Sequence, residues 1–147
     1  MGQTPSAQFY HQLTQLRATL GEEHPDTLAA WRDYTTALMD EGNYKKAQPE
    51  LRQLVAACEW AFGPEHPTTR SNRADWALCL KETNLYLLAL EQYLLVADYD
   101  DGYDVRFAAV GCYIRLGRFA EATYLLHAVV RGYAKTLGGR HDLTRLA

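Results

Sequence analysis

The sequence predicts an all-α protein, a stack of antiparallel helical hairpins, and two observations support this prediction. The first is self-similarity, because Leu20–Leu28 (LGEEHPDTL) is echoed by Phe62–Arg70 (FGPEHPTTR) and by Leu137–Thr144 (LGGRHDLT). Segments that recur at a regular interval indicate a repeat architecture. The second is that apolar residues between these segments recur at the spacing of one helix face. We therefore expect about seven helices and no sheet.

The repeat period can be measured twice. His24 and His66 are 42 residues apart, and so are Ala47 and Ala89, which lie in GNYKKA and NLYLLA. A third copy, GRFAEA at Gly117–Ala122, follows the second after only 33 residues. The second junction is therefore shorter, while the architecture continues.

Glycine and proline mark the expected helix ends. Gly42 and Gly117 suit a left-handed helix end, a conformation that glycine adopts without strain. Pro25 and Pro67 suit the first turn of a helix, because the missing amide hydrogen leaves nothing unpaired there. The expected helices span residues 6–20, 26–41, 44–62, 68–83, 86–99, 103–116 and 119–137.

These residues resemble a known family. The patterns LGxEHPxT and GxYxxAxPxL, the latter at Gly42, Tyr44, Ala47, Pro49 and Leu51, resemble the long tetratricopeptide repeat (TPR) of kinesin light chains and of many bacterial sensor proteins. Further matches to the family's packing positions are Trp31, Tyr34, Leu38, Trp76, Leu80, Tyr86, Ala89, Tyr113, Gly117, Phe119 and Ala122. The departures are Asn84 for the turn glycine, Arg73 and Arg106 at an aromatic position, and Val110 at a small-residue position. The resemblance implies a right-handed superhelical stack of helix hairpins, a TPR-like α-solenoid.

The repeats predict a single domain over residues 1–147. Its parts are an orphan helix at 6–20, repeats at 26–62, 68–99 and 103–137, and the start of a further repeat or a tail at 141–147. The array thus begins half-way through a hairpin. Because solenoid ends need a polar cap, we expect a fragment of a longer protein or ends covered by another subunit.

Composition argues against several classes of partner. The formal net charge is -3, and the Lys and Arg residues are scattered, so no basic stripe predicts nucleic-acid binding. The apolar runs are shorter than the roughly 20 residues that a membrane helix needs. The N-terminus lacks the pattern of a secretory signal. We therefore expect a cytoplasmic protein with no membrane and no nucleic-acid partner.

The sequence nominates no catalytic, metal or cofactor residue. Cys79 and Cys112 occupy one repeat position, which Ala37 fills in the first repeat, so they predict buried structural thiols, as does Cys58 on an apolar face. The histidines His24, His66 and His141 belong to the repeated turn and are expected to be turn and cap residues. The usual nucleophile and phosphate-binding motifs are missing. These observations predict a protein that is not an enzyme.

The resemblance implies a binding surface, since first helices of stacked hairpins line a concave groove that takes a partner peptide or helix. The groove-facing positions are Arg32, Thr36, Met39, Leu78, Lys81, Glu82, Phe107, Ile114 and Arg115. We expect Phe107 and Leu78 to be the apolar anchors. The family's carboxylate-clamp positions read Arg32, Asp33, Thr36, Ala74, Asp75 and Leu78, which lack the clamp asparagines, so a C-terminal carboxylate ligand is not expected.

Two alternatives stay open beside a peptide-binding scaffold. In the first alternative, the chain is a sensor or oligomerisation module of a larger bacterial regulator. In the second, its groove binds a small apolar ligand. Flanking sequence would distinguish the first alternative from a free-standing scaffold. A thermal-shift ligand screen beside a pull-down would distinguish the second, because a bound ligand stabilises the fold.

Six leucines in the second helix of the middle repeat predict an interface. At the 42-residue offset, polar residues of the first repeat are replaced by Leu85, Leu87, Leu88, Leu90, Leu94 and Leu95. One helix cannot turn all six inward together with its packing face, so several should be exposed. They predict a homodimer or partner contact on the convex side. The alternative is that the shorter connector buries them locally.

Overall fold

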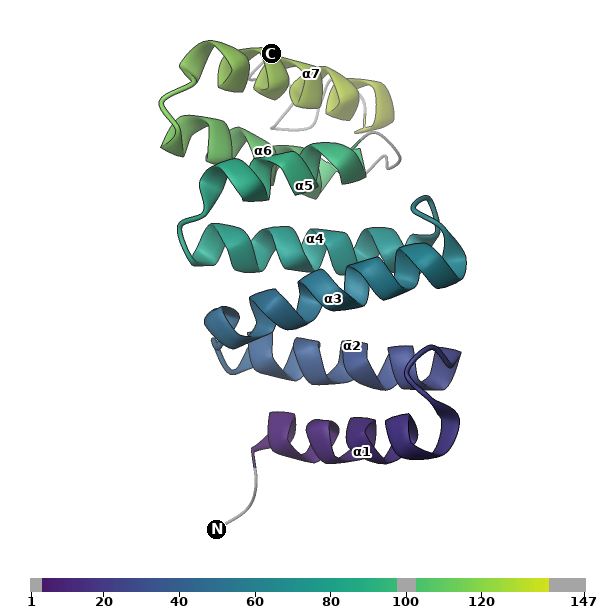
Figure 1. Ribbon diagram of the computed structural model, residues 1–147. Coiled ribbons are helices and arrows are strands. Elements are labelled where there is room, and N and C mark those ends of the chain that lie inside the picture. Colours follow the sequence, from purple (N-terminus) through teal and green to yellow (C-terminus); the bar gives the residue numbers. More distant parts are fainter. Residues whose placement is uncertain (1–3, 98–102, 138–147) are drawn as a thin grey trace. The chain divides into compact units, whose positions relative to one another are not determined.

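The computed structural model describes residues 4–97 and 103–137, and within them it contains seven helices and no strand (Figure 1). The helices are α1 (Pro5–Leu20), α2 (Pro25–Asp40), α3 (Tyr44–Phe62), α4 (Pro67–Glu82), α5 (Tyr86–Ala97), α6 (Tyr103–Arg115) and α7 (Phe119–Leu137). Each predicted boundary is met within two residues, so the all-α prediction is confirmed. The echo after Leu137, including His141 and the expected start of a further repeat, lies outside the described residues.

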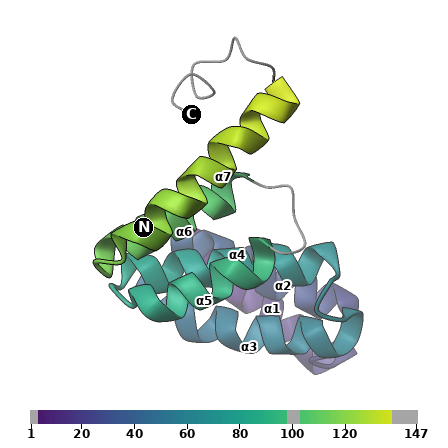
Figure 2. The same cartoon turned by 90° about the horizontal axis from the view of Figure 1, so that it is seen from above.

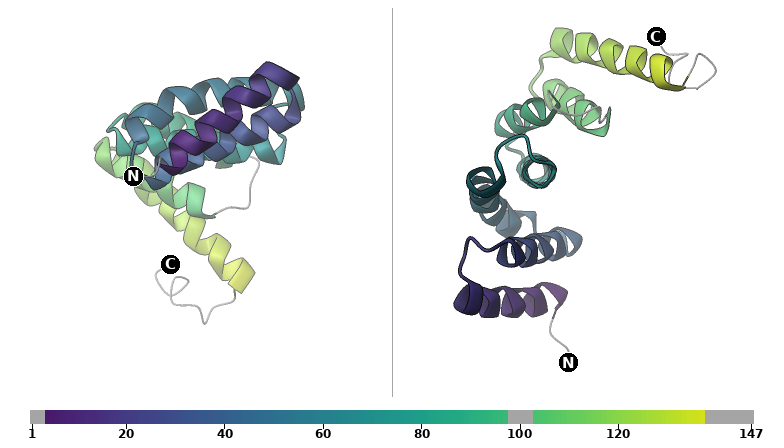
Figure 3. Two further views of the ribbon diagram at one scale, coloured as in Figure 1. Left: turned by 90° about the horizontal axis from the view of Figure 1, so that it is seen from below. Right: turned by 90° about the vertical axis from the view of Figure 1, so that its right-hand side faces the viewer.

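The chain divides into two compact units, Met1–Asn84 and Leu85–Ala147. The first contains α1 to α4, and each of these helices packs against the next (Figures 1 and 2). The second contains α5 to α7, in which α6 packs against both α5 and α7 (Figure 3). The boundary falls between α4 and α5, inside the predicted middle repeat at 68–99.

Two repeated HisPro steps start α2 and α4. His24 Nδ1 accepts a hydrogen bond from the Asp26 amide, and His66 Nδ1 accepts one from the Thr68 amide, both at 3.1 Å. Each ring thereby satisfies one of the amides that a helix start leaves unpaired. The prediction that these histidines are cap residues is confirmed.

The helix-ending turns use a left-handed residue, as expected. Gly42 and Gly117 each have φ of 75°. Asn84 takes the place of the turn glycine after α4 and has φ of 67°. Asparagine tolerates this region better than most residues, so this departure from the repeat pattern leaves the turn intact.

The core of the first unit is a continuous apolar cluster along α1 to α4. Its residues are Leu13, Leu28, Ala30, Trp31, Tyr34, Leu38, Ala47, Leu51, Leu54, Cys58 and Cys79. Arg73 stands at the position of Trp31 and forms an ion pair with Glu59 of α3, so a charged pair replaces an aromatic contact without breaking α4. In the second unit, the buried positions include Ala89, Tyr93, Val96, Ala109, Cys112, Ala122, Val129 and Val130.

Candidate functional site

Arg32 connects α2 to α4 within the first unit. Its Nη1 donates to Asn72 Oδ1 at 2.6 Å, and its Nη2 lies 3.9 Å from Asp75 Oδ2. Asn72 is fully buried and donates its own amide to Cys58 Sγ at 3.4 Å. The guanidinium that the sequence predicted to edge the groove is therefore already held by two partners on the neighbouring helix.

The pKa of the Asp75 carboxyl group depends on its burial and on its contact with Arg32. Burial raises the pKa of its carboxyl group above the ordinary value, and the Arg32 guanidinium opposes that rise. A ligand carboxylate would have to compete with the nearby Asp75 carboxylate for the Arg32 guanidinium. The contact therefore argues, independently of the missing clamp asparagines, against recognition of a C-terminal carboxylate here.

Asn72 is the residue that sequence reasoning missed. It follows Ala30 by the repeat period of 42 residues, and both positions are buried. A buried polar side chain is stable only with hydrogen-bond partners, which Arg32 and Cys58 provide. The signal available in the sequence was this replacement of a small apolar residue by a polar one.

The remaining predicted groove positions of the first unit lie on α2 and α4, and we refer to them as the mixed strip. Thr36 is exposed, and Met39 is half-buried and packs against the core cluster. Leu78 and Lys81 are half-buried, while Glu82 is exposed. The strip thus offers apolar side chains together with charged groups.

A pocket between α1 and α2 adjoins this strip. Its volume is about 340 Å³, and it is lined by Pro5, Phe9, Asp33, Thr36, Ala37, Asp40 and Glu41. Thr36 belongs both to the pocket and to the predicted groove. The wall supplied by α1 had no counterpart in the sequence prediction, because only the tertiary structure places Phe9 opposite Thr36. Three carboxylates around an apolar floor make this pocket a poor site for a purely apolar ligand.

The predicted groove residues of the second unit all lie on α6. Phe107 is half-buried, whereas Ile114 and Arg115 are exposed. The Arg115 guanidinium lies over the Tyr86 ring of α5, 5.8 Å from its centroid. An arginine held over an aromatic face keeps its hydrogen-bond donors available to a partner.

The leucines of α5 are only partly exposed, which corrects one member of the predicted interface. Leu90 is 2% exposed and is a core residue, and Leu94 is half-buried. Leu85, Leu87, Leu88 and Leu95 are between 45% and 52% exposed. Leu90 lies on the same helix face as Ala89, Tyr93 and Val96, which pack inward, whereas Leu87, Leu88 and Leu95 lie on the opposite face.

The three cysteines are free and buried. Burial, together with the negative charges of Asp75 and Glu82, raises the pKa of the Cys79 thiol to about 12. Thiolate is the reactive form, so Cys79 is chemically inert at neutral pH. Among the residues that the structure describes, no three His, Cys, Asp or Glu side chains are grouped as a metal would need. No described helix is both long and apolar enough to cross a bilayer.

Comparison with known proteins yields matches to solved structures. No family model and no curated protein matches the sequence. A crystal structure of a kinesin light chain from Podosopora anserina with nearly identical TPR-like repeats matches with a TM-score of 0.84 and 23% identity, covering 94% of this chain and 70% of that one. A single-substitution variant of that protein matches with a TM-score of 0.85 and 24% identity, covering 94% and 69%. The chain therefore has the fold of TPR-like repeats, an all-α solenoid.

Proposed function

We propose that this chain is a non-catalytic interaction scaffold that binds a peptide or helix of a partner protein along α2 and α4 of the first unit, and that the predicted α6 residues are a contact surface of the second unit. The observation that carries the proposal is the mixed strip on the first unit, where Met39 is half-buried on α2 and Leu78 lies one helical turn before Lys81 and Glu82 on α4. TPR-like solenoids commonly present such surfaces to protein partners. Apolar anchors with charged edges suit an amphipathic segment laid in a groove.

The Arg32 contacts narrow the class of ligand. Since Arg32 is held by Asn72 and Asp75, the strip offers no free arginine on α2 to grip a terminal carboxylate. We therefore infer that the partner segment is internal to its chain and is bound mainly through apolar side chains. The exposed carboxylates Asp33 and Asp40, at the α1–α2 pocket, favour a segment with a basic residue at one end.

A peptide selection tests this proposal without a known partner. Random internal peptides displayed on phage would be selected on the purified chain, and the affinity of the winners would be measured by fluorescence polarisation. Leu78→Ala, alone and with Phe107→Ala, should weaken binding on the order of 30-fold, the equivalent of about 2 kcal/mol for a buried anchor. Gln53→Ala, at an exposed position on α3, is the matched control and should leave the affinity unchanged.

Two results would refute the groove assignment. One is a selection that enriches no peptide family. The other is a set of peptides whose affinity is the same for the Leu78 variants and the parent protein. Circular dichroism on each variant shows that a loss of binding is not a loss of fold, because a helical solenoid that unfolds loses its helical signal.

The exposed leucines favour a second role, self-association, as an oligomerisation module of a larger regulator would require. Leu87, Leu88 and Leu95 share one face of α5, and the chain's own first repeat has polar residues at the corresponding positions Lys45, Lys46 and Gln53. We propose that this face contacts a second copy or another protein. The free cysteines support a cytoplasmic setting for either role, because reducing compartments keep thiols unpaired.

A further inference from the structure

A second pocket of the first unit lies on α1, α2 and α3. Its volume is about 460 Å³, within the range of small-molecule sites. The N-terminal half of α1 forms one wall, Tyr34 contributes from α2, and Lys46 and Glu50 contribute from α3. None of these residues belongs to the groove strip, so the pocket is separate from the proposed peptide site.

Tyr34 brings an unpaired hydroxyl to this pocket. The residue is 3% exposed, and its ring packs against Tyr10 with centroids 5.1 Å apart. Among the described residues, none forms a hydrogen bond with the Tyr34 hydroxyl, and its oxygen is not one of the buried unpaired atoms, so it is accessible from the open pocket. Burial, followed by the charge of Glu50, raises the pKa of Tyr34, so the hydroxyl keeps its proton at neutral pH and can donate it to a ligand.

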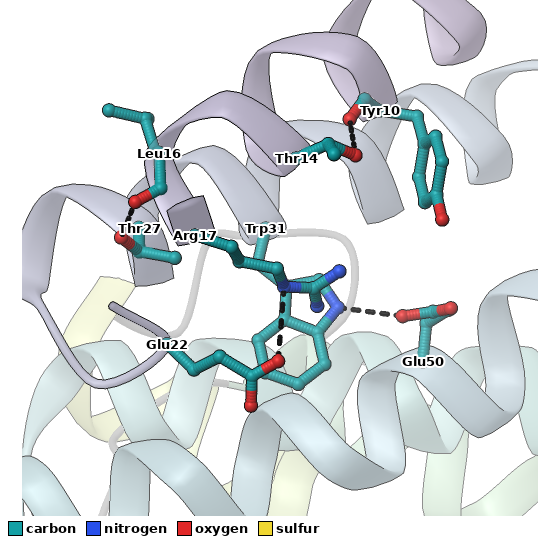
Figure 4. Close-up of polar contacts among 8 residues, drawn as sticks. All are labelled: Tyr10, Thr14, Leu16, Arg17, Glu22, Thr27, Trp31 and Glu50. Carbon is teal, nitrogen blue, oxygen red and sulfur yellow. Dashed lines mark hydrogen bonds and ion pairs between the residues drawn. The ribbon is translucent and has the colours of Figure 1, made fainter. Parts of the chain in front are cut away.

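Glu50 is oriented by the core and retains one oxygen for a ligand. Its Oε2 accepts from Trp31 Nε1 at 2.8 Å, and Figure 4 shows this contact together with the Tyr10 ring. The Arg17 guanidinium lies over the Trp31 ring, 4.8 Å from its centroid. Within the described chain, Glu50 Oε1 has no hydrogen-bond partner.

Lys46 is an exposed lysine one helical turn before Glu50. Its ammonium group is beyond ion-pair distance of every carboxylate in the described residues, Glu50 included. A lysine that precedes glutamate by four residues is in the weaker orientation for a helix ion pair, and Trp31 holds the glutamate elsewhere. The pocket therefore presents a cation and an anion that do not neutralise each other.

The Ser6 and Ala7 amides at the start of α1 are not free to bind an anionic group of a ligand. The amide of Ser6 donates to Glu41 Oε1 at 3.4 Å, and that of Ala7 donates to Thr4 Oγ1 at 3.3 Å. The hydroxyls of Thr4 and Ser6 are hydrogen-bonded to each other at 3.2 Å. A ligand would consequently find its charged contacts on Lys46 and Glu50 and its hydrogen bond at Tyr34.

We propose that this pocket binds a free α-amino acid with an apolar side chain. Lys46 and the Tyr34 hydroxyl bind the carboxylate, Glu50 Oε1 accepts from the ammonium group, and the side chain packs on the Tyr10 ring. A ligand with only one charge contacts only one of Lys46 and Glu50, whereas a zwitterion makes a charged contact with each, which gives the pocket its preference for a zwitterion.

Calorimetric titration of the purified chain with L-phenylalanine and L-leucine tests the proposal. N-acetyl-L-phenylalanine lacks the ammonium group and L-phenylalaninamide lacks the carboxylate, and each should bind at least roughly tenfold more weakly than phenylalanine because a charged hydrogen bond is lost. Tyr34→Phe and Lys46→Gln should each weaken binding by a similar factor. Lys45→Gln, at the exposed neighbouring lysine, is the matched control and should bind as the parent protein does.

Failure of the amino-acid proposal can be distinguished from failure of the proposed peptide binding. Leu78→Ala should leave amino-acid binding unchanged, since Leu78 is not part of this pocket. The proposal is overturned if none of the standard amino acids produces heat of binding or a shift in the unfolding midpoint. It is also overturned if Tyr34→Phe and Lys46→Gln bind phenylalanine as well as the parent. Equal binding of N-acetyl-L-phenylalaninamide and phenylalanine would show that the pocket takes a peptide segment, and would overturn it too.

Discussion

Replacing Leu87 and Leu88 by lysine tests whether α5 carries an interface. The two side chains are 52% and 48% exposed, and the first repeat has Lys45 and Lys46 at these positions. Lysine and leucine have nearly the same helix propensity. Since exposed substitutions change stability by about 0.5 kcal/mol each, the double variant should keep its fold and lose at most about 1 kcal/mol of its free energy of unfolding.

The strength of the expected association follows from the exposed fractions. Leu85, Leu87, Leu88 and Leu95 each have about half of their surface left to bury. Full burial of a leucine contributes about 1.5–3 kcal/mol, so covering the remaining halves on both copies of a dimer contributes about 6–12 kcal/mol. Loss of translational and rotational freedom costs about 4–15 kcal/mol. The leucines alone therefore support only a weak, concentration-dependent association.

Sedimentation equilibrium at concentrations from about 10 to about 500 µM spans the regime in which a weak dimer forms. The parent chain should depart from its monomer mass of 16.7 kDa at the upper end, and the double lysine variant should keep it throughout. Gln53→Ala on α3 should behave like the parent. A parent protein that stays at monomer mass over the whole range would refute the interface, and a double variant that loses its helical circular dichroism would show that these leucines are core residues.

Three further predictions concern substitutions of single residues. His66→Ala removes the ring that caps α4 and should lower the free energy of unfolding by about 0.5–2 kcal/mol in urea titration; an unchanged midpoint would contradict the capping role. Gly117→Ala places a Cβ at φ of 75° with no atom within 4 Å, so backbone strain alone should lower the free energy of unfolding by about 1 kcal/mol. Gly111→Ala inside α6 should instead raise it by up to about 1 kcal/mol. Equal effects of the two substitutions would show that backbone conformation does not decide the outcome. Because burial raises the pKa of Cys79 to about 12, the folded state holds this proton more tightly than the unfolded chain. The stability that results is complete below the thiol's ordinary pKa and is lost as pH rises toward 12. Between about pH 8 and pH 11 the parent should lose on the order of 2 kcal/mol more than Cys79→Ala, and parallel curves in alkaline denaturation would refute this.

Local chemistry determined the helices of this protein, and the sequence displays that chemistry directly. Pro25 and Pro67 occur where a helix begins, and Gly42 and Gly117 where one ends. Such signals act within a few residues, so they can be located without knowledge of the fold. Asn84 shows the limit of a pattern based on residue type, because it takes the left-handed conformation that the repeat elsewhere gives to glycine.

The repeat comparison also anticipated which positions face inward, but not where polar groups meet. Ala47, Ala89, Cys58, Cys79 and Cys112 are buried as predicted. Leu90 was placed with the interface leucines although it is buried, since the 42-residue comparison registers a change of residue type and not the direction of the side chain.

What the tertiary structure alone decided are contacts between residues far apart in the sequence. Arg32 and Asn72 are 40 residues apart, and Trp31 and Glu50 are 19 apart, yet each pair forms a short hydrogen bond across neighbouring helices. The pocket over Tyr34 likewise combines the start of α1 with the start of α3. Helical periodicity fixes the face on which a side chain lies but not the height at which two helices pack, and that height determines whether a cation meets a carboxylate, an amide or an open pocket.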